Sequence, residues 1–118
     1  MIETLFKLLC GHAVADFCLQ SDFIAKNKNR HNLPMGYDPK LHGPIQKVWF
    51  HVLTAHALTH GLAVYLATGN IFFGILETIA HCVIDFGKCE KWFGIHVDQA
   101  LHILCKLLWA TLPKILST

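Results

Sequence analysis

Residues 48–67 read VWFHVLTAHALTHGLAVYLA, and this stretch decides the fold. From its first residue through residue 76, the chain contains no Asp, Glu, Lys or Arg. The stretch is too long for a strand and lacks the apolar–polar alternation of a half-buried one, so it predicts a long buried helix. It contains three histidines, of which His56 and His60 are spaced four residues apart. Because residues i and i+4 share one face of a helix, both imidazoles should point the same way.

Loop-forming residues on either side of this stretch delimit further helices. A polar segment rich in Lys, Asn, Pro and Gly precedes it, and Pro44 suits the first turn of a helix. No hairpin signal competes with the helical pattern. We therefore predict an all-α, four-helix bundle with a polar core lined by His and Asp. Its bounds are one domain over 1–118, helices at about 3–20, 44–67, 71–86 and 98–116, and a loop at 26–43.

The composition is unusually apolar for a chain of 118 residues. Hydrophobic residues make up 53% and charged residues 15% of the chain, with a mean hydropathy of +0.42, whereas soluble domains average roughly 45–50% and about 25%. The predicted helix 44–67 exceeds the roughly 20 residues that cross a bilayer. We therefore predict an integral membrane protein, with a soluble bundle of very apolar interior as the alternative. The net charge of only +2 predicts no nucleic-acid partner.

The charged residues predict an orientation for such a protein. Seven of the ten Lys and Arg residues lie in the loops 26–47 and 87–97. Because positive loops stay on the cytoplasmic side of a membrane, we predict that both loops are cytoplasmic and that membrane lipid is a partner. Trp109 and the long side chain of Lys106 would then reach the bilayer interface.

Five cysteines are scattered through the chain without any Cys-x-x-Cys spacing. The odd number and the apolar neighbours argue against a disulfide framework or a zinc ribbon. We expect the cysteines to be small buried residues.

Histidine and aspartate recur at a spacing of four. The pentads His12-Ala-Val-Ala-Asp16 and His81-Cys-Val-Ile-Asp85 are each followed by Phe, and Asp98-Gln-Ala-Leu-His102 has the reverse order. On a helix each pair presents both groups to one point. All lie in apolar sequence, where an unpartnered carboxylate or imidazole is costly.

The helix bounds place the carboxylates at similar depth, near the basic loops, with the imidazoles about one turn deeper. Neutral imidazole and carboxylate suit Zn²⁺, Mn²⁺ or Fe²⁺, and helical bundles build such sites from facing helices. We predict a divalent-metal site near the cytoplasmic face. The predicted ligands are His12, Asp16, His56, His81, Asp85, Asp98 and His102, and the predicted catalytic residues are Asp16, Asp85 and Asp98.

A metal with an open coordination position makes a bound water acidic, which supports hydrolysis of an ester or phosphoester. A carboxylate left free of the metal would serve as the general base. The alternative is a non-enzymatic membrane protein whose His/Asp cluster is structural and whose loop 26–43 binds a protein partner. Haem binding by facing histidines is a third hypothesis, which the many carboxylates disfavour.

The same motifs resemble a family of small bacterial and phage integral membrane proteins known as domain of unknown function 3307. The matching elements are His12-xxx-Asp16-Phe17-x-Leu19-Gln20, Asp22-xx-Ala25-x-Asn27-Lys28, His56 with His60, His81-xxx-Asp85 with Lys88, and Asp98-Gln99-xx-His102. The resemblance implies the bacterial inner membrane and no assigned activity. It supports a hydrolase only by analogy with membrane-bound metal-dependent hydrolases. The loop 26–43 is longer and richer in Pro and Gly than the family pattern.

Overall fold

The computed structural model describes residues 1–33, 36–44 and 47–116, the last four by their backbone alone. Its elements are α1 (Ile2–Ala13), the π-helical turn η1 (Val14–Cys18), α2 (Asp22–Asn27), α3 (Pro39–His42), α4 (Trp49–Thr68), α5 (Ile71–Cys89) and α6 (Ile95–Leu116). These residues contain no strand. The predicted all-α class is therefore confirmed.

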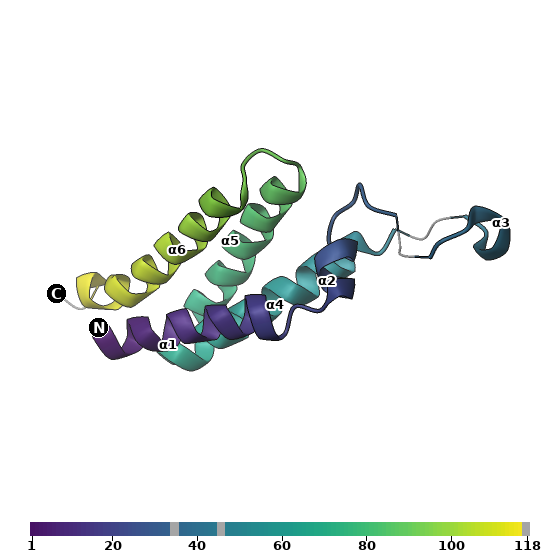
Figure 1. Cartoon of the computed structure of the whole chain (residues 1–118). Helices are drawn as coiled ribbons and strands as arrows, with labels where there is room; N and C mark the ends of the chain where they lie inside the picture. Colours follow the sequence, from purple (N-terminus) through teal and green to yellow (C-terminus); the bar gives the residue numbers. More distant parts are fainter. Residues whose placement is uncertain (34–35, 45–46, 117–118) are drawn as a thin grey trace.

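The four long helices form a closed ring in which α1 packs on α4, α4 on α5, α5 on α6, and α6 on α1. Both ends of the chain lie at one end of this bundle, and the short helix α3 stands apart at the opposite end (Figure 1). Among the described residues α3 contacts none of the other helices. The molecule is elongated as a result, with extents of 62 × 25 × 22 Å.

The tight turn between α4 and α5 makes these two helices antiparallel neighbours. Gly69 ends α4 in the left-handed region at φ 69°, and the side chain of Asn70 accepts a hydrogen bond of 2.9 Å from the backbone N–H of Phe72. The sequence placed this boundary correctly. At the other end α4 begins at Trp49, so Pro44 does not start the helix as predicted.

A contact between two glycines sets the close approach of α4 and α5. A Cβ added to Gly61 would lie 2.6 Å from the carbonyl oxygen of Gly74, and one added to Gly74 would lie 2.9 Å from the carbonyl oxygen of Gly61. Real side-chain atoms do not approach backbone so closely, so both positions require Gly. This spacing holds His60, the neighbour of Gly61, beside α5.

The predicted helix 3–20 is interrupted by a wider turn. The backbone N–H of Leu19 donates to the carbonyl of Val14 at 2.9 Å, five residues back, which defines the π-helical turn η1. Asp16 lies in this turn. Single π turns inside helices often occur at functional sites, and here the turn delivers a carboxylate to the bundle interior.

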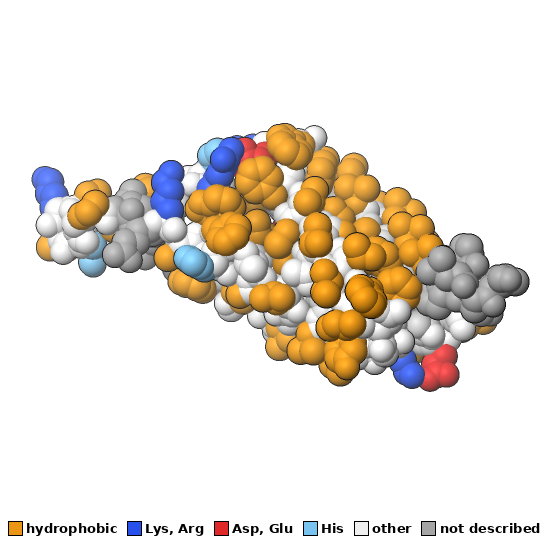
Figure 2. Space-filling view, turned by 180° about the vertical axis from the view of Figure 1, so that it is seen from behind, with side chains coloured by type: hydrophobic (Ala, Val, Ile, Leu, Met, Phe, Trp, Pro, Cys, Tyr) orange, Lys and Arg blue, Asp and Glu red, His pale blue; other side chains and the backbone are white. Residues whose placement is uncertain are grey.

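The apolar core is small compared with the apolar content of the chain. Leu8, Val64, Phe73 and Trp109 form its centre. Many large apolar side chains lie outside it, and they cover much of the face in Figure 2. The hydrophobic composition therefore reflects the outer surface as much as the core.

The membrane prediction is wrong. Among the described residues, no helix combines the length and the apolar content that a membrane crossing requires. The three histidines of α4 and the ionisable groups on the inner faces of α5 and α6 lower the hydropathy of otherwise apolar helices. This finding overturns the predicted inner-membrane location and the cytoplasmic placement of loops 26–47 and 87–97.

All five cysteines are free, as the sequence predicted. Their predicted burial is wrong for Cys10 and Cys18, which are exposed.

Candidate metal centre

Two ladders of ionisable side chains face each other across the α5–α6 contact. Each ladder follows an i, i+4, i+8 spacing, which places all its members on one helix face. They are Glu77, His81 and Asp85 on α5, and Asp98, His102 and Lys106 on α6, and none is more than 2% exposed. Because the helices are antiparallel, the two imidazoles meet at the centre, with ring centroids 4.3 Å apart.

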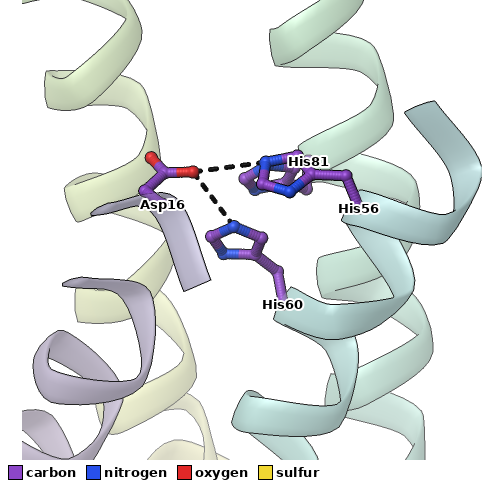
Figure 3. A group of neighbouring side chains, drawn as sticks. All are labelled: Asp16, His56, His60 and His81. Atoms are coloured by element: carbon purple, nitrogen blue, oxygen red, sulfur yellow. Dashed lines mark hydrogen bonds and ion pairs between the residues drawn. The ribbon is translucent and has the colours of Figure 1, made fainter. Parts of the chain in front are cut away.

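Asp16 reaches toward this centre from the π turn, and three imidazoles from α4 and α5 lie together opposite its carboxylate (Figure 3). Its Oδ1 lies 3.1 Å from Nε2 of His60 and 3.3 Å from Nε2 of His56. The ring of His81 stacks on that of His60 with centroids 3.6 Å apart. Three separate elements therefore deliver one carboxylate and three imidazoles to one point.

These four residues, which we call the Asp16 set, have the geometry of a metal site. One ligand atom from each of Asp16, His56, His60 and His81 lies within 4.8 Å of all the others. Ligands about 2.0–2.1 Å from a tetrahedral ion are roughly 3.3 Å apart, close to the 3.1 and 3.3 Å that separate Asp16 Oδ1 from the two α4 nitrogens.

Several buried ring nitrogens in this set lack a hydrogen-bond partner among the described residues. They are both nitrogens of His81, Nε2 of His56 and Nδ1 of His60. Burial lowers the pKa of His60 to about 3, and its contact with Asp16 offsets only part of that effect. His60 is therefore a neutral imidazole at pH 7, which is the form that binds a metal.

The charge balance of the cluster singles out Asp16. Three of its four carboxylates contact a lysine, in the pairs Lys28–Asp85, Lys88–Asp98 and Lys106–Glu77. In the described part of the chain, Asp16 contacts only imidazoles and the amide of Gln99. Burial alone would raise the pKa of Asp16, but contacts with His56, His60 and Gln99 outweigh it and hold that pKa well below its usual range. Asp16 is thus an ionised, nearly buried carboxylate without a cation.

Asp85, Asp98 and His102 form a second group, which we call the Asp98 set. Nε2 of His102 lies 3.6 Å from Oδ1 of each carboxylate, and one ligand atom from each residue lies within 4.8 Å of the other two. Burial lowers the pKa of His102, but the two carboxylates outweigh that effect and raise it. The environment of this set therefore favours a positive charge.

Gln99 connects the two sets. Its amide nitrogen donates to Asp16 Oδ2 at 3.1 Å and to Asp98 Oδ2 at 3.3 Å, while its carbonyl accepts a hydrogen bond of 3.1 Å from Nε2 of His12. That proton occupies the nitrogen of His12 that faces the cluster. His12, which we predicted as a ligand, belongs to none of the potential metal-ligand groups.

The other predicted ligands all lie in the cluster. Asp16, His56 and His81 are in the Asp16 set, and Asp85, Asp98 and His102 form the Asp98 set. His60, which the sequence analysis placed on the same face as His56 but left out of the ligand list, directly contacts Asp16.

Sequence analysis missed a third part of the cluster. Glu77 is fully buried and accepts hydrogen bonds from Lys106 and from the indole N–H of Trp109, the latter at 2.6 Å. Lys106 is 1% exposed, and Trp109 lies in the core, so the predicted interfacial positions of both are wrong. The spacing of four that links His81 to Asp85 and Asp98 to His102 continues to Glu77 and to Lys106, and this pattern was visible in the sequence. Lys28, from the end of α2, was also missed, because its partner Asp85 is 57 residues away.

Among the described residues of the cluster, the most exposed lie at its end beside α2 and the α5–α6 turn. The side chain of Lys88 is 32% exposed and that of Asp16 9%, whereas those of His60 and His81 are fully buried. Any ligand would therefore enter from this end.

The fold and cluster define a class: a helical bundle with a buried His/Asp centre suited to a divalent metal ion. Within that class, the chain belongs to the family described as protein of unknown function (DUF3307), whose model matches residues 4–117. The family resemblance found in the sequence is thereby confirmed. No curated protein and no solved structure matches the chain.

Proposed function

We propose that this protein binds a divalent metal ion through Asp16, His56, His60 and His81 and hydrolyses an ester or phosphoester. The single observation that carries the proposal is the Asp16 set itself. Four ligand atoms converge within 4.8 Å, and buried nitrogens there have no hydrogen-bond partner in the described structure. An ionised carboxylate with no cationic partner completes the argument, because burying an uncompensated charge is costly.

The donor set suits Zn²⁺, Mn²⁺ or Fe²⁺, since imidazole nitrogen and carboxylate oxygen bind all three. When bound, such an ion supplies Lewis acidity, which polarises the substrate and makes a bound water ionise near neutral pH. The protein's own part is to hold the ligands. Gln99 fixes the free oxygen of Asp16, and the stacked rings of His60 and His81 restrict each other's rotation.

Glu77 supports this arrangement from behind. Its Oε1 lies 3.7 Å from Nδ1 of His81, on the side of the ring away from Nε2. This distance is too long for a hydrogen bond, but it places the carboxylate on the side from which carboxylates commonly orient metal-binding histidines. The partially exposed end beside Lys88 would admit the substrate.

Metal stoichiometry tests the proposal directly. Protein stripped with a chelator and dialysed against Zn²⁺ should regain bound zinc, measured by inductively coupled plasma mass spectrometry. His60→Gln should bind one ion fewer and lose metal-dependent hydrolysis of p-nitrophenyl acetate or bis(p-nitrophenyl) phosphate. The exposed His96 gives the matched control, since His96→Gln should change neither readout. Wild-type protein that binds no divalent metal under these conditions would overturn the proposal.

A second candidate function follows from the lysine pairs. Because Lys28, Lys88 and Lys106 already compensate three buried carboxylates, the cluster could serve only to hold the bundle together. The segment around α3, which stands clear of the bundle (Figure 1), would then act as the partner-binding loop that we predicted at 26–43. Thermal stability that is unchanged by zinc and by chelator would favour this function over the first.

A further inference from the structure

The Asp98 set has features that the proposed single-ion site does not use. Nothing in the ligand set of the first ion requires Asp85, Asp98 or His102. Yet all three are no more than 2% exposed, and Asp98 Oδ1 and His102 Nε2 have no hydrogen-bond partner among the described residues. Buried polar atoms of this kind are normally satisfied by protein, water or an ion.

The lysines leave one oxygen of each carboxylate directed at His102. Lys28 contacts Oδ2 of Asp85, and Lys88 contacts Oδ2 of Asp98 at 3.1 Å. The other oxygen, Oδ1, of each carboxylate lies 3.6 Å from Nε2 of His102. Two carboxylate oxygens and one imidazole nitrogen therefore converge at a point that neither lysine occupies.

Asp85 also faces the first site. Its Oδ2 lies 3.6 Å from Nε2 of His56 and 3.6 Å from Nε2 of His81, both members of the Asp16 set. Asp85 thus places Oδ1 beside His102 of the Asp98 set and Oδ2 beside the histidines of the Asp16 set. A carboxylate in this position can bridge two metal ions, and paired ions are a recurrent arrangement in enzymes that hydrolyse phosphoesters.

We propose that a second divalent cation binds between Asp85, Asp98 and His102, with Asp85 bridging it to the ion of the Asp16 set. This inference rests on the proposed metal-dependent function. The second cation brings together the two unpartnered buried atoms.

The experiment uses the full chain and Mn²⁺ or Zn²⁺ as probes. By equilibrium dialysis the wild type should bind two ions per chain, and Asp98→Asn should bind one. Asp22→Asn is the matched control, since the side chain of Asp22 is 92% exposed, and it should still bind two. If Asp98→Asn fails to fold, as judged by circular dichroism, His102→Gln replaces it with the same expected loss of one ion.

Electron paramagnetic resonance of the Mn²⁺-loaded wild type supplies a test that needs no variant. A bridged pair should give an exchange-coupled signal, and Asp98→Asn should give the hyperfine spectrum of isolated Mn²⁺. One ion per wild-type chain, or two ions without coupling, overturns the bridged second site while leaving the proposed function intact. Retention of both ions by Asp98→Asn also overturns it. Wild-type protein without any ion defeats both proposals.

Discussion

Two buried polar groups in the same bundle differ in one respect, namely whether their charges are balanced. At the deep end, Lys106 and Trp109 donate hydrogen bonds to the two carboxylate oxygens of Glu77. About two turns nearer the loops, Asp16 faces only imidazoles and an amide, and several ring nitrogens are unsatisfied. The comparison teaches that burial and spacing alone do not identify a ligand site. Both oxygens of Glu77 are hydrogen-bonded, one of them to a lysine, whereas the Asp16 carboxylate has no lysine partner in the described part of the chain.

The largest expected effect comes from disrupting the deep group, which consists of Glu77, Lys106 and Trp109. Lys106→Met removes the cation from a fully buried Glu77 and should lower the free energy of unfolding by about 3–5 kcal/mol, because an uncompensated buried charge remains. Urea denaturation measures this loss. Adding Glu77→Gln in the same chain should recover part of it, since the charge is then gone. A Lys106→Met protein as stable as wild type would show that the deep group is not a closed ion pair.

Low pH should weaken the interactions that Glu77 makes in the same group. Burial raises the pKa of Glu77, but contacts with His81 and Lys106 outweigh it and lower that pKa to about 2 from an ordinary 4.5. A lowered folded-state pKa stabilises the protein fully above about pH 4.5, and this contribution disappears as pH falls toward 2. The stability difference between wild type and Glu77→Gln should therefore be largest near neutrality, up to about 3 kcal/mol, and should shrink across that window. A difference that stays constant down to pH 2 would contradict the assignment.

Metal should act on the Asp16 set and not on the deep group of Glu77, Lys106 and Trp109. Zinc at a free concentration of about 100 times its Kd should stabilise wild-type protein by about 2.7 kcal/mol, because the ion binds the folded state. Asp16→Asn should lose most of this gain, whereas Lys106→Met, although less stable, should keep it. Differential scanning calorimetry with and without zinc measures both. Equal zinc responses in wild type and Asp16→Asn would remove the distinction between the two groups.

The close approach of α4 and α5 should matter more for the Asp16 set, which contains His60, than for the deep group. Gly61→Ala places a methyl group against the backbone of Gly74 and should cost about 1–3 kcal/mol through overpacking. Because Gly61 follows His60, the forced separation should also weaken zinc affinity, which isothermal titration calorimetry would detect. Gly94→Ala is the control, since an added Cβ there meets nothing within 4 Å. Unchanged zinc affinity in Gly61→Ala would mean that the Asp16 set tolerates movement of α4.

The sequence was informative where the physics is local. The helix–turn boundary at Gly69 and Asn70 and the pairing of His81 with Asp85 follow from capping and helical spacing, and both could be predicted. The π turn that carries Asp16, and the reach of Lys28 to Asp85, depend on tertiary packing and left no local pattern. The membrane prediction failed because the apolar composition of the whole chain hid the ionisable groups that lower the hydropathy of the individual long helices. Here the ionisable groups are gathered inside and the apolar side chains outside.

The smallest expected effect is the most discriminating one. In metal-free protein, Asp16→Asn should change the free energy of unfolding by only about 1 kcal/mol or less, because an amide can keep hydrogen bonds to the surrounding side chains. The change also removes a buried charge that has no lysine partner among the described residues, which offsets the weakening of the contacts to His56 and His60. Urea denaturation in the presence of chelator measures it, with Asp22→Asn as an exposed reference. A loss as large as that of Lys106→Met would mean that Asp16 is a structural partner of the imidazoles, and the contrast between the two groups would no longer hold.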